Sequence, residues 1–198
     1  MHDSMPLPIP SQEWPDKLAG VLNDLHGEPE NIHKIMANSP DLLIACWPIR
    51  NYLIDGSSIG KRKSEIAALR LAVHMNCWYE WASRSDRALR LGIEVEEMLG
   101  LLEPVAERPW VEEERALIMA IDDLVEHRRI RPVTLAILDK NYSNQQVMDI
   151  ITLHGVHTTL AGMVTTWGLT LDQDTVGRVS HIIDEYSFKQ RSEDISAC

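Results

Sequence analysis

The stretch Ser64–Gly92 has the sequence SEIAALRLAVHMNCWYEWASRSDRALRLG and decides which fold we expect. Across residues 61–73 the apolar side chains recur at helical spacing, with lysine and arginine at positions between them. A second helix is predicted over 77–91, because Gly92 stands where a glycine commonly ends a helix. Two consecutive helices therefore form the centre of the predicted structure.

Helix signals continue on both sides of this centre. Pro40 takes the first-turn position of a helix predicted over 41–54. Ser143 and Gln146 form a capping box before a long apolar helix over 144–167. No run of β-branched residues alternates with polar ones, as strands would require. The sequence predicts an all-α protein of about eight helices.

The chain is predicted to form one domain with short ends. Residues 1–10 contain three prolines and are expected to form an extended arm. Ser11 is predicted to cap the first helix, over 11–25, and the helical domain then continues to residue 188. Residues 189–198 form a polar tail that we expect to fray. A length of 198 residues is typical of a single domain.

Composition argues against several classes of function. The net charge is −11 and the densest basic cluster is Lys61–Lys63, so no nucleic-acid partner is expected, because such binding depends on neutralising phosphates. The sequence has no run of roughly 18 uninterrupted apolar residues and no amino-terminal signal pattern, so we expect neither a membrane span nor secretion. Three cysteines are too few for a disulfide scaffold and favour a reducing, cytoplasmic location.

The candidate chemistry is concentrated in the quoted stretch. On a helix, Cys77, Glu80 and Arg84 fall within about 60° of one another, so a thiol, a carboxylate and a guanidinium share one face. Glu65 lies at the far end of the preceding helix, and His74 lies one turn before Cys77. The alternative is structural, because a glutamate and an arginine four residues apart often form a solvated ion pair worth only a few tenths of a kcal/mol.

Three groups of residues in this stretch resemble the core signature of the carboxymuconolactone decarboxylase / alkyl hydroperoxidase D-like superfamily: Glu65-x-x-x-Leu69-Arg70, Tyr79-Glu80-Trp81 and Ala88-x-x-x-Gly92. The segments 31–43, 112–117 and 145–169 are similar to the flanking parts of the same superfamily. The resemblance spans about residues 30–170, and on it the chain is identified as a member of that superfamily.

The resemblance implies an all-helical fold that assembles into homo-oligomers (dimer, trimer or hexamer), with sites near subunit contacts. The predicted helix over 111–128 also presents an apolar face that we expect a partner to cover. The superfamily carries out two chemistries. One is decarboxylation or proton transfer on lactones and small acids, and the other is peroxide reduction through a Cys-x-x-Cys pair.

In this chain Cys77 takes the first cysteine position and Glu80 takes the second. A disulfide cycle needs a resolving thiol close in space, so the redox chemistry is the weaker interpretation. We expect a lyase or isomerase that moves protons on a small carboxylated metabolite, lactone or aromatic-derived. Two alternatives stay open: a thiol-dependent reductase acting through Cys77, and a non-catalytic binding or scaffold protein.

Arg84 is the main departure from the superfamily pattern, which usually has a histidine at this position. An arginine keeps its proton near neutral pH, so it cannot relay protons as a histidine does. We expect Arg84 to bind an anionic group of the substrate, with Glu65 or Glu80 as general acid or base. If Arg84 pairs tightly with Glu80, the pKa of Glu80 falls, and Glu65 or His74 becomes the proton carrier.

Further residues are candidates for substrate binding. Tyr79 and Trp81 belong to the signature, and His154 and His157 lie one turn apart in the long carboxyl-terminal helix, where either can replace the missing base. A zinc site would need further ligands, so we predict no metal, and interior filling is the alternative for His157. The tryptophans Trp47, Trp78, Trp81 and Trp167 are candidates for a pocket wall or for core. The sequence has no phosphate-binding loop, so we expect no cofactor.

Overall fold

A computed structural model of the protein describes residues 6–196, in which the chain is helical and contains no strand. Residues 1–5 of the expected arm and 197–198 of the expected tail lie outside the described residues. Short 3-10 helices span Ser11–Glu13, Asp16–Leu18 and Val105–Glu107, and a π-helix spans Tyr52–Gly56. The α-helices in the described part are α1 Ala19–Asp24, α2 Asn31–Met36, α3 Pro40–Asn51, α4 Lys61–His74, α5 Trp78–Arg90, α6 Val95–Gly100, α7 Glu112–His127, α8 Pro132–Asn141, α9 Asn144–Trp167, α10 Gln173–Val179 and α11 Glu185–Ser196.

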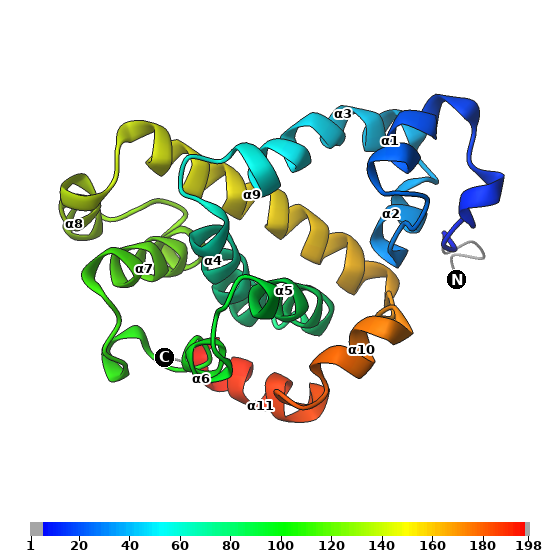
Figure 1. Ribbon diagram of the computed structural model, residues 1–198. Helices are drawn as coiled ribbons and strands as arrows, with labels where there is room; N and C mark the ends of the chain where they lie inside the picture. The colour runs from blue at the N-terminus through cyan, green and yellow to red at the C-terminus, as the bar shows by residue number, and fades with distance from the viewer. Residues whose placement is uncertain (1–5, 197–198) are drawn as a thin grey trace.

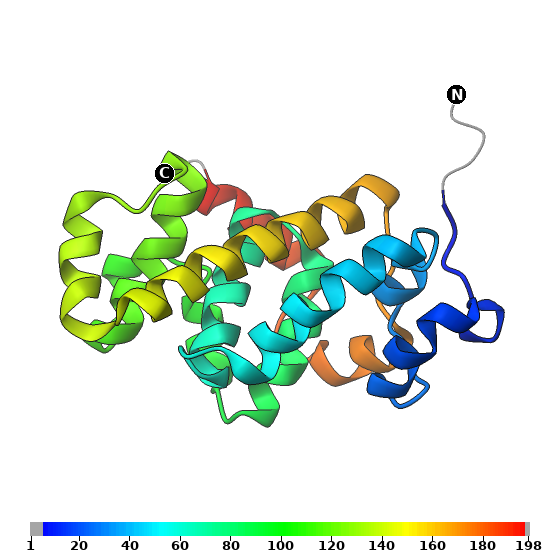
Figure 2. The same ribbon diagram turned by 90° about the horizontal axis from the view of Figure 1, so that it is seen from above.

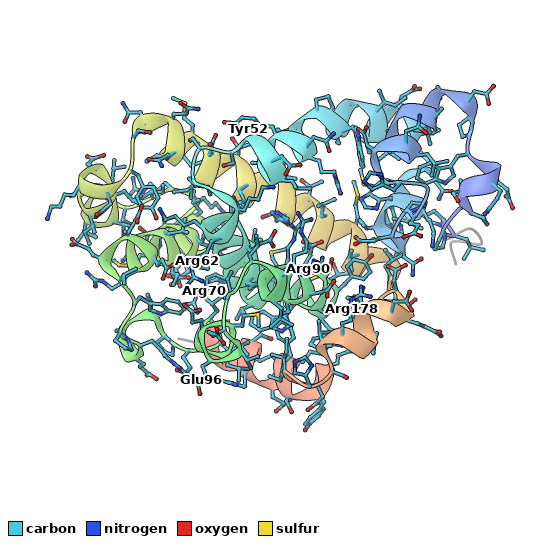
Figure 3. All side chains as sticks on the ribbon, viewed as in Figure 1. Tyr52, Arg62, Arg70, Arg90, Glu96 and Arg178 are labelled. Atoms are coloured by element: carbon cyan, nitrogen blue, oxygen red, sulfur yellow. The ribbon has the colours of Figure 1, made fainter. Side chains whose placement is uncertain are left out.

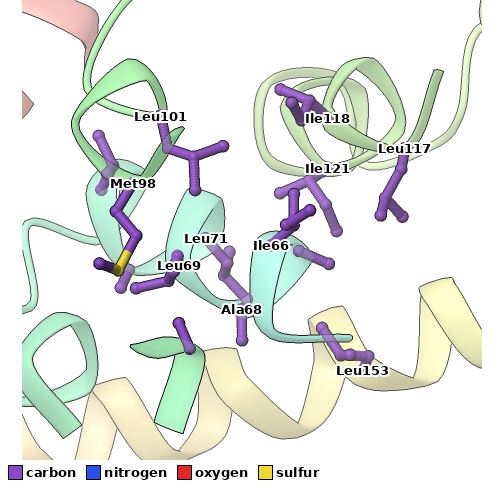
Figure 4. Packing of buried hydrophobic residues seen from close by; sticks show 14 of the residues in the cluster. Ile66, Ala68, Leu69, Leu71, Met98, Leu101, Leu117, Ile118, Ile121 and Leu153 are labelled. Carbon is purple, nitrogen blue, oxygen red and sulfur yellow. The ribbon is translucent and has the colours of Figure 1, made fainter. Parts of the chain in front are cut away.

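Helix α4 lies at the centre of the molecule, where it packs against α5, α7, α9 and α11 (Figure 1). Every residue from Ser64 to Val73 is buried, so α4 is covered on all sides. The charged residues Glu65 and Arg70 are therefore inside the protein, where each needs a partner. Figure 4 shows the apolar side chains around this helix: Ile66, Leu69, Leu71, Met98, Leu101, Leu117, Ile118, Ile121 and Leu153.

A second apolar cluster joins the amino-terminal helices to the rest of the protein. Across it, α2 and α3 face the second half of α9 and the start of α5 (Figure 2). Its buried members are Leu18, Val21, Ile32, Ile35, Met36, Ala37, Leu43, Trp47, Cys77, Tyr79, Ala161 and Val164. The candidate site lies beside this cluster.

Several local signals in the sequence are confirmed. Pro40 is the first residue of α3. The Ser143 hydroxyl accepts a hydrogen bond from the Gln146 backbone N–H at 3.3 Å, and the Gln146 side chain accepts one from the Ser143 N–H at 2.8 Å. After α5, Gly92 has a φ of +74°, a conformation that glycine adopts without strain.

Two boundary predictions were wrong. The helix expected over 11–25 is broken after Glu13, because Pro15 disfavours helical geometry at Trp14, whose backbone is extended. The tail expected from residue 189 continues as helix α11 to Ser196. The cause lies at Phe188, which is fully buried with its ring centroid 5.2 Å from that of Trp81 and anchors α11 to α5.

Helices α7 and α9 concern two expectations from the sequence, that a partner subunit covers α7 and that the chain has no membrane span. The apolar face of α7 is covered within the chain by α4, α8 and α9, so it needs no partner. Helix α9 is long and apolar enough to cross a membrane by length and composition alone. However, this helix carries the buried Asp149, whose carboxylate accepts hydrogen bonds from Tyr52 and Ser58 at 2.8 and 2.7 Å.

Candidate functional site

A cavity of about 150 Å³ lies between α2, α3, α5 and α9. Most of its wall is apolar and includes Ile32, Met36, Leu42, Leu43, Trp47, Ile49, Val156, Leu160 and Met163. Charged and polar side chains also line it, among them Glu30, His33, Arg50, Tyr79, Glu80, Arg84 and Arg87. An apolar cavity with a few convergent polar groups is the usual form of a small-molecule site.

Glu80 on α5 is the buried carboxylate of this cavity, with 5% of its surface exposed. Its Oε2 atom lies 2.9 Å from Nδ1 of His157 on α9. Burial alone would raise the pKa of Glu80, but the hydrogen bond from His157 and the charge of Arg84 outweigh it and lower the pKa. Burial, with Arg84, lowers the pKa of His157. At neutral pH the pair therefore consists of a carboxylate and a neutral imidazole that donates Nδ1–H to it.

Arg84 stands between two buried carboxylates. Its Nη1 lies 3.4 Å from Glu65 Oε1, and its Nε lies 3.7 Å from Glu80 Oε2. Arg87 approaches the same Glu65 oxygen at 3.2 Å. The second Glu65 oxygen and the Arg84 Nε have no hydrogen-bond partner in the described structure. The charge of Arg84 is thus balanced by two carboxylates of the protein. Of these two, Glu80 lines the cavity and Glu65 does not.

The amino-terminal wall supplies polar groups that sequence reasoning missed. Glu30 caps α2, and its backbone N–H donates to His33 Nδ1 at 3.2 Å. Burial and the charge of Arg50 lower the pKa of His33 to about 3, so this ring is neutral. The Arg50 guanidinium lies 4.4 Å from the centre of the Trp47 ring, and both side chains line the cavity.

Cys77 and Tyr79 lie at the edge of the cavity region. Cys77 is 1% exposed and borders a separate surface hollow near α10 and α11, not the cavity. Burial raises the pKa of its thiol to about 11, which keeps it protonated at neutral pH. Tyr79 lines both the cavity and this hollow, and its hydroxyl accepts a hydrogen bond from the Ile32 N–H at 3.1 Å.

The structure does not bring His74, Trp81 or His154 to the cavity. His74 Nε2 lies 2.7 Å from Asp122 on α7, and Arg70 (Figure 3) binds the same carboxylate at 2.6 Å. Trp81 packs in the core against Phe188, and His154 is half-buried, with its pKa lowered by burial. Within residues 6–196, no three histidine, cysteine, aspartate or glutamate side chains group as metal ligands.

Some residues of the cavity could have been predicted from the sequence and others could not. Arg87 follows Arg84 by one helical turn, so spacing alone places it on the neighbouring position of the same face. Glu30 and Arg50 stand singly in helices without a motif, so no pattern connects them to the quoted stretch.

Comparisons with known proteins place the fold. No family model and no curated protein matches the sequence. A solved structure of the debrominase Bmp8, a variant in complex with 2,3,4-tribromopyrrole, superposes with a TM-score of 0.78 at 15% identity, covering 92% of this chain and 99% of that one. An uncharacterized peroxidase-related protein from Silicibacter sp. TM1040 gives 0.74 at 16% identity, covering 90% and 98%. An AhpD-like antioxidant protein of unknown function from Agrobacterium tumefaciens gives 0.64 at 17%, covering 69% and 94%. The chain therefore has the carboxymuconolactone decarboxylase / AhpD-like fold.

Proposed function

We propose that this chain, which has the AhpD-like fold, is a cofactor-independent enzyme that moves a proton on a small carboxylated metabolite. The observation that carries the proposal is the Glu80–His157 pair: a buried carboxylate lining an apolar cavity, with an imidazole 2.9 Å away. Such a pair can hold one additional proton between its two members. The reaction is of the lyase or isomerase type.

Glu80 is the general base in this proposal, even though its pKa is lowered, because the two alternative proton carriers, Glu65 and His74, lie outside the cavity lining. It takes a proton from a carbon next to a carbonyl group, and the electron pair of the C–H bond remains on the substrate as an enolate. His157 is a positioning residue, because its Nδ1–H fixes the Glu80 carboxylate and shares the proton that arrives there. Arg84 keeps Glu80 ionised before the reaction, and the apolar wall excludes water.

The redox alternative has less support. The fold relatives include a peroxidase-related protein and a debrominase, but at 15–17% identity their activities do not transfer. The thiol of Cys77 is buried, protonated at neutral pH and not among the residues that line the cavity. A nucleophilic cysteine is usually an exposed thiolate. A non-catalytic binding role uses the same cavity, and the experiment below separates it from catalysis.

We also propose that the protein is a cytoplasmic homo-oligomer. Large apolar side chains are exposed on two helices of the described structure: Leu42, Ile44 and Ile49 on α3, and Met148 and Ile151 on α9. A second copy of the chain is the proposed cover for this surface, because contiguous exposed apolar residues on a soluble protein commonly mark an interface.

The test is deuterium exchange into small acids in D₂O, followed by proton NMR, together with release of carbon dioxide. The substrates are 2-oxo acids, 3-oxo acids and unsaturated γ-lactones that carry one carboxylate. We expect enzyme-dependent exchange or decarboxylation of at least one of these compounds. Glu80→Gln should abolish the reaction, and His157→Gln should slow it.

Cys77→Ser is the matched control, because Cys77 lies outside the cavity lining and its loss should leave the rate unchanged. Exchange that persists in Glu80→Gln would show that another group is the base. No reaction with any of the three classes, in a protein that binds them, would favour the non-catalytic alternative.

A further inference from the structure

Arg50, at the end of α3, is a cavity-lining cation without an ion pair in the described residues. Its Nη1 donates a hydrogen bond to the Asn51 side chain at 3.0 Å, and its guanidinium stacks on Trp47 at 4.4 Å. Burial, followed by the charges of Arg87 and Arg84, lowers its pKa to about 10, so it still carries its charge at neutral pH. Among the described residues no carboxylate lies within ion-pair distance of this half-buried cation, and the charges of Glu30 and Asp24 act on it only from farther away.

The nearby carboxylates are occupied elsewhere. Asp24 accepts hydrogen bonds from Trp47 Nε1 at 2.7 Å and from Asn51 Nδ2 at 3.2 Å. The Glu30 side chain caps α2, and burial raises its pKa. Glu65 and Glu80 pair with Arg84, and Glu65 also pairs with Arg87. Arg50 is therefore the guanidinium of the cavity whose charge is left for a ligand.

We propose that Arg50, positioned over the Trp47 ring, recognises the carboxylate of a small ligand whose apolar body fills the cavity. The planar fork of arginine matches a carboxylate with two parallel hydrogen bonds. The cation–π contact with Trp47, 4.4 Å from the ring centre, holds the guanidinium in place before the ligand arrives. This assignment moves anion recognition away from Arg84, whose two neighbouring carboxylates already use its charge.

The size and wall of the cavity restrict the rest of the ligand. An apolar cavity of about 150 Å³ in an unrelated protein takes up benzene, so one small ring, or a branched chain of similar bulk, fits here. The wall of Ile, Leu, Met and Trp side chains offers that body few hydrogen bonds. The ligand class is therefore a monocarboxylate with a single compact apolar body.

The test uses benzoate and its neutral isostere benzamide, with affinity measured by isothermal titration. We expect wild type to bind benzoate more tightly than benzamide. Arg50→Gln should weaken benzoate binding by at least about tenfold, the loss expected when a charged hydrogen bond is removed. Its affinity for benzamide should stay unchanged. Arg50→Lys keeps the charge but not the fork and should fall between wild type and Arg50→Gln.

The matched control is Arg90→Gln, which removes an exposed arginine of α5 that pairs with Asp86 outside the cavity. Circular dichroism checks that each variant is folded. Equal benzoate affinity in wild type and Arg50→Gln would overturn the proposal, as would equal affinity of wild type for benzoate and benzamide. Absence of saturable benzoate binding at millimolar concentration would also overturn it.

The role of Arg50 rests on one part of the proposed function, namely that the cavity is the site where the substrate binds. Binding is measured without turnover, so the two can fail separately. Benzoate binding that depends on Arg50, in a protein with no exchange activity, would keep the inference and reject the proposed enzyme. Glu80→Gln should lose exchange while it still binds benzoate through Arg50.

Discussion

Replacing Arg84 by alanine tests whether this residue balances buried charges or binds the ligand. The guanidinium, with 14% of its side chain exposed, lies within 3.7 Å of two carboxylates that are each 6% exposed. Removing it leaves Glu65 and Glu80 buried with less compensation. Breaking a buried ion pair by removing one partner commonly costs about 3–5 kcal/mol.

The lower end of that range applies here. Glu65 keeps Arg87 at 3.2 Å, and Glu80 keeps His157 at 2.9 Å, so neither carboxylate loses its last partner. Neither lost contact is short, at 3.4 and 3.7 Å. We therefore expect Arg84→Ala to lower the free energy of unfolding at neutral pH by about 3 kcal/mol.

The pH dependence of this cost gives the sharper test. In wild type the pKa of Glu80 lies below its ordinary value, so Glu80 contributes stability above the unfolded pKa of about 4.3 and loses it as pH falls through the folded pKa. Without Arg84, the pKa of Glu80 should rise toward the unfolded value, because burial still raises it and only His157 is left to lower it. The variant therefore loses part of the stability that ionised Glu80 contributes at neutral pH, and this loss disappears once Glu80 is protonated in both proteins. The difference between wild type and variant should be greatest at neutral pH and shrink on acidification.

The assay is urea denaturation at several pH values, with Arg90→Ala (Figure 3) as control. Arg90 is 61% exposed and forms an i,i+4 pair with Asp86, so its loss should cost no more than about 1 kcal/mol at any pH. A cost for Arg84→Ala that equals that of Arg90→Ala, or that does not change with pH, would refute the charge-balancing role.

Three further predictions concern other parts of the molecule. In urea denaturation, Asp122→Ala should lower the free energy of unfolding by about 3 kcal/mol, because Arg70, which is 3% exposed, loses the carboxylate that it pairs with. The control Asp41→Ala removes an exposed carboxylate and should have little effect. Cys77 should react with iodoacetamide at least about tenfold more slowly than the less buried Cys46 in peptide mapping, and equal rates would contradict its buried, protonated state. Light scattering should give a mass above the 22.5 kDa of one chain, and Met148→Glu with Ile151→Glu should lower it toward the monomer; a monomeric wild type would reject the oligomer.

The helices of the quoted stretch were predictable because their signals are local. The spacing of apolar residues predicts α4 and α5. Gly92 marks the end of α5 and the Ser143 capping box marks the start of α9, and each of these signals depends on a few neighbouring residues. The break at Pro15 is also local, because a proline disfavours helical geometry at the residue before it. Phe188 is different, because its burial against Trp81 depends on the fold bringing α11 to α5, which no local pattern contains.

The candidate site was predictable in part for the same reason. Glu80 and Arg84 share a helix face, so their proximity follows from spacing. Glu65 and His157 were named from the superfamily resemblance and from the missing histidine, and the structure brings both to the same charge cluster. The contribution of Arg50 could not be predicted, because its charge becomes available only where α3 packs and leaves it without a carboxylate.

The position of Arg84 has a consequence for the proposed chemistry. In the superfamily that the sequence resembles, a histidine is expected at this position of α5, whereas in this chain the imidazole beside Glu80 is that of His157 on α9. In the proposed chemistry, two residues take the place of that histidine. Arg84 helps to keep the Glu80 carboxylate ionised, and His157, whose pKa is lowered, would orient the carboxylate and share the incoming proton. His157→Gln should accordingly slow exchange more than it weakens benzoate binding, whereas Arg50→Gln should do the reverse.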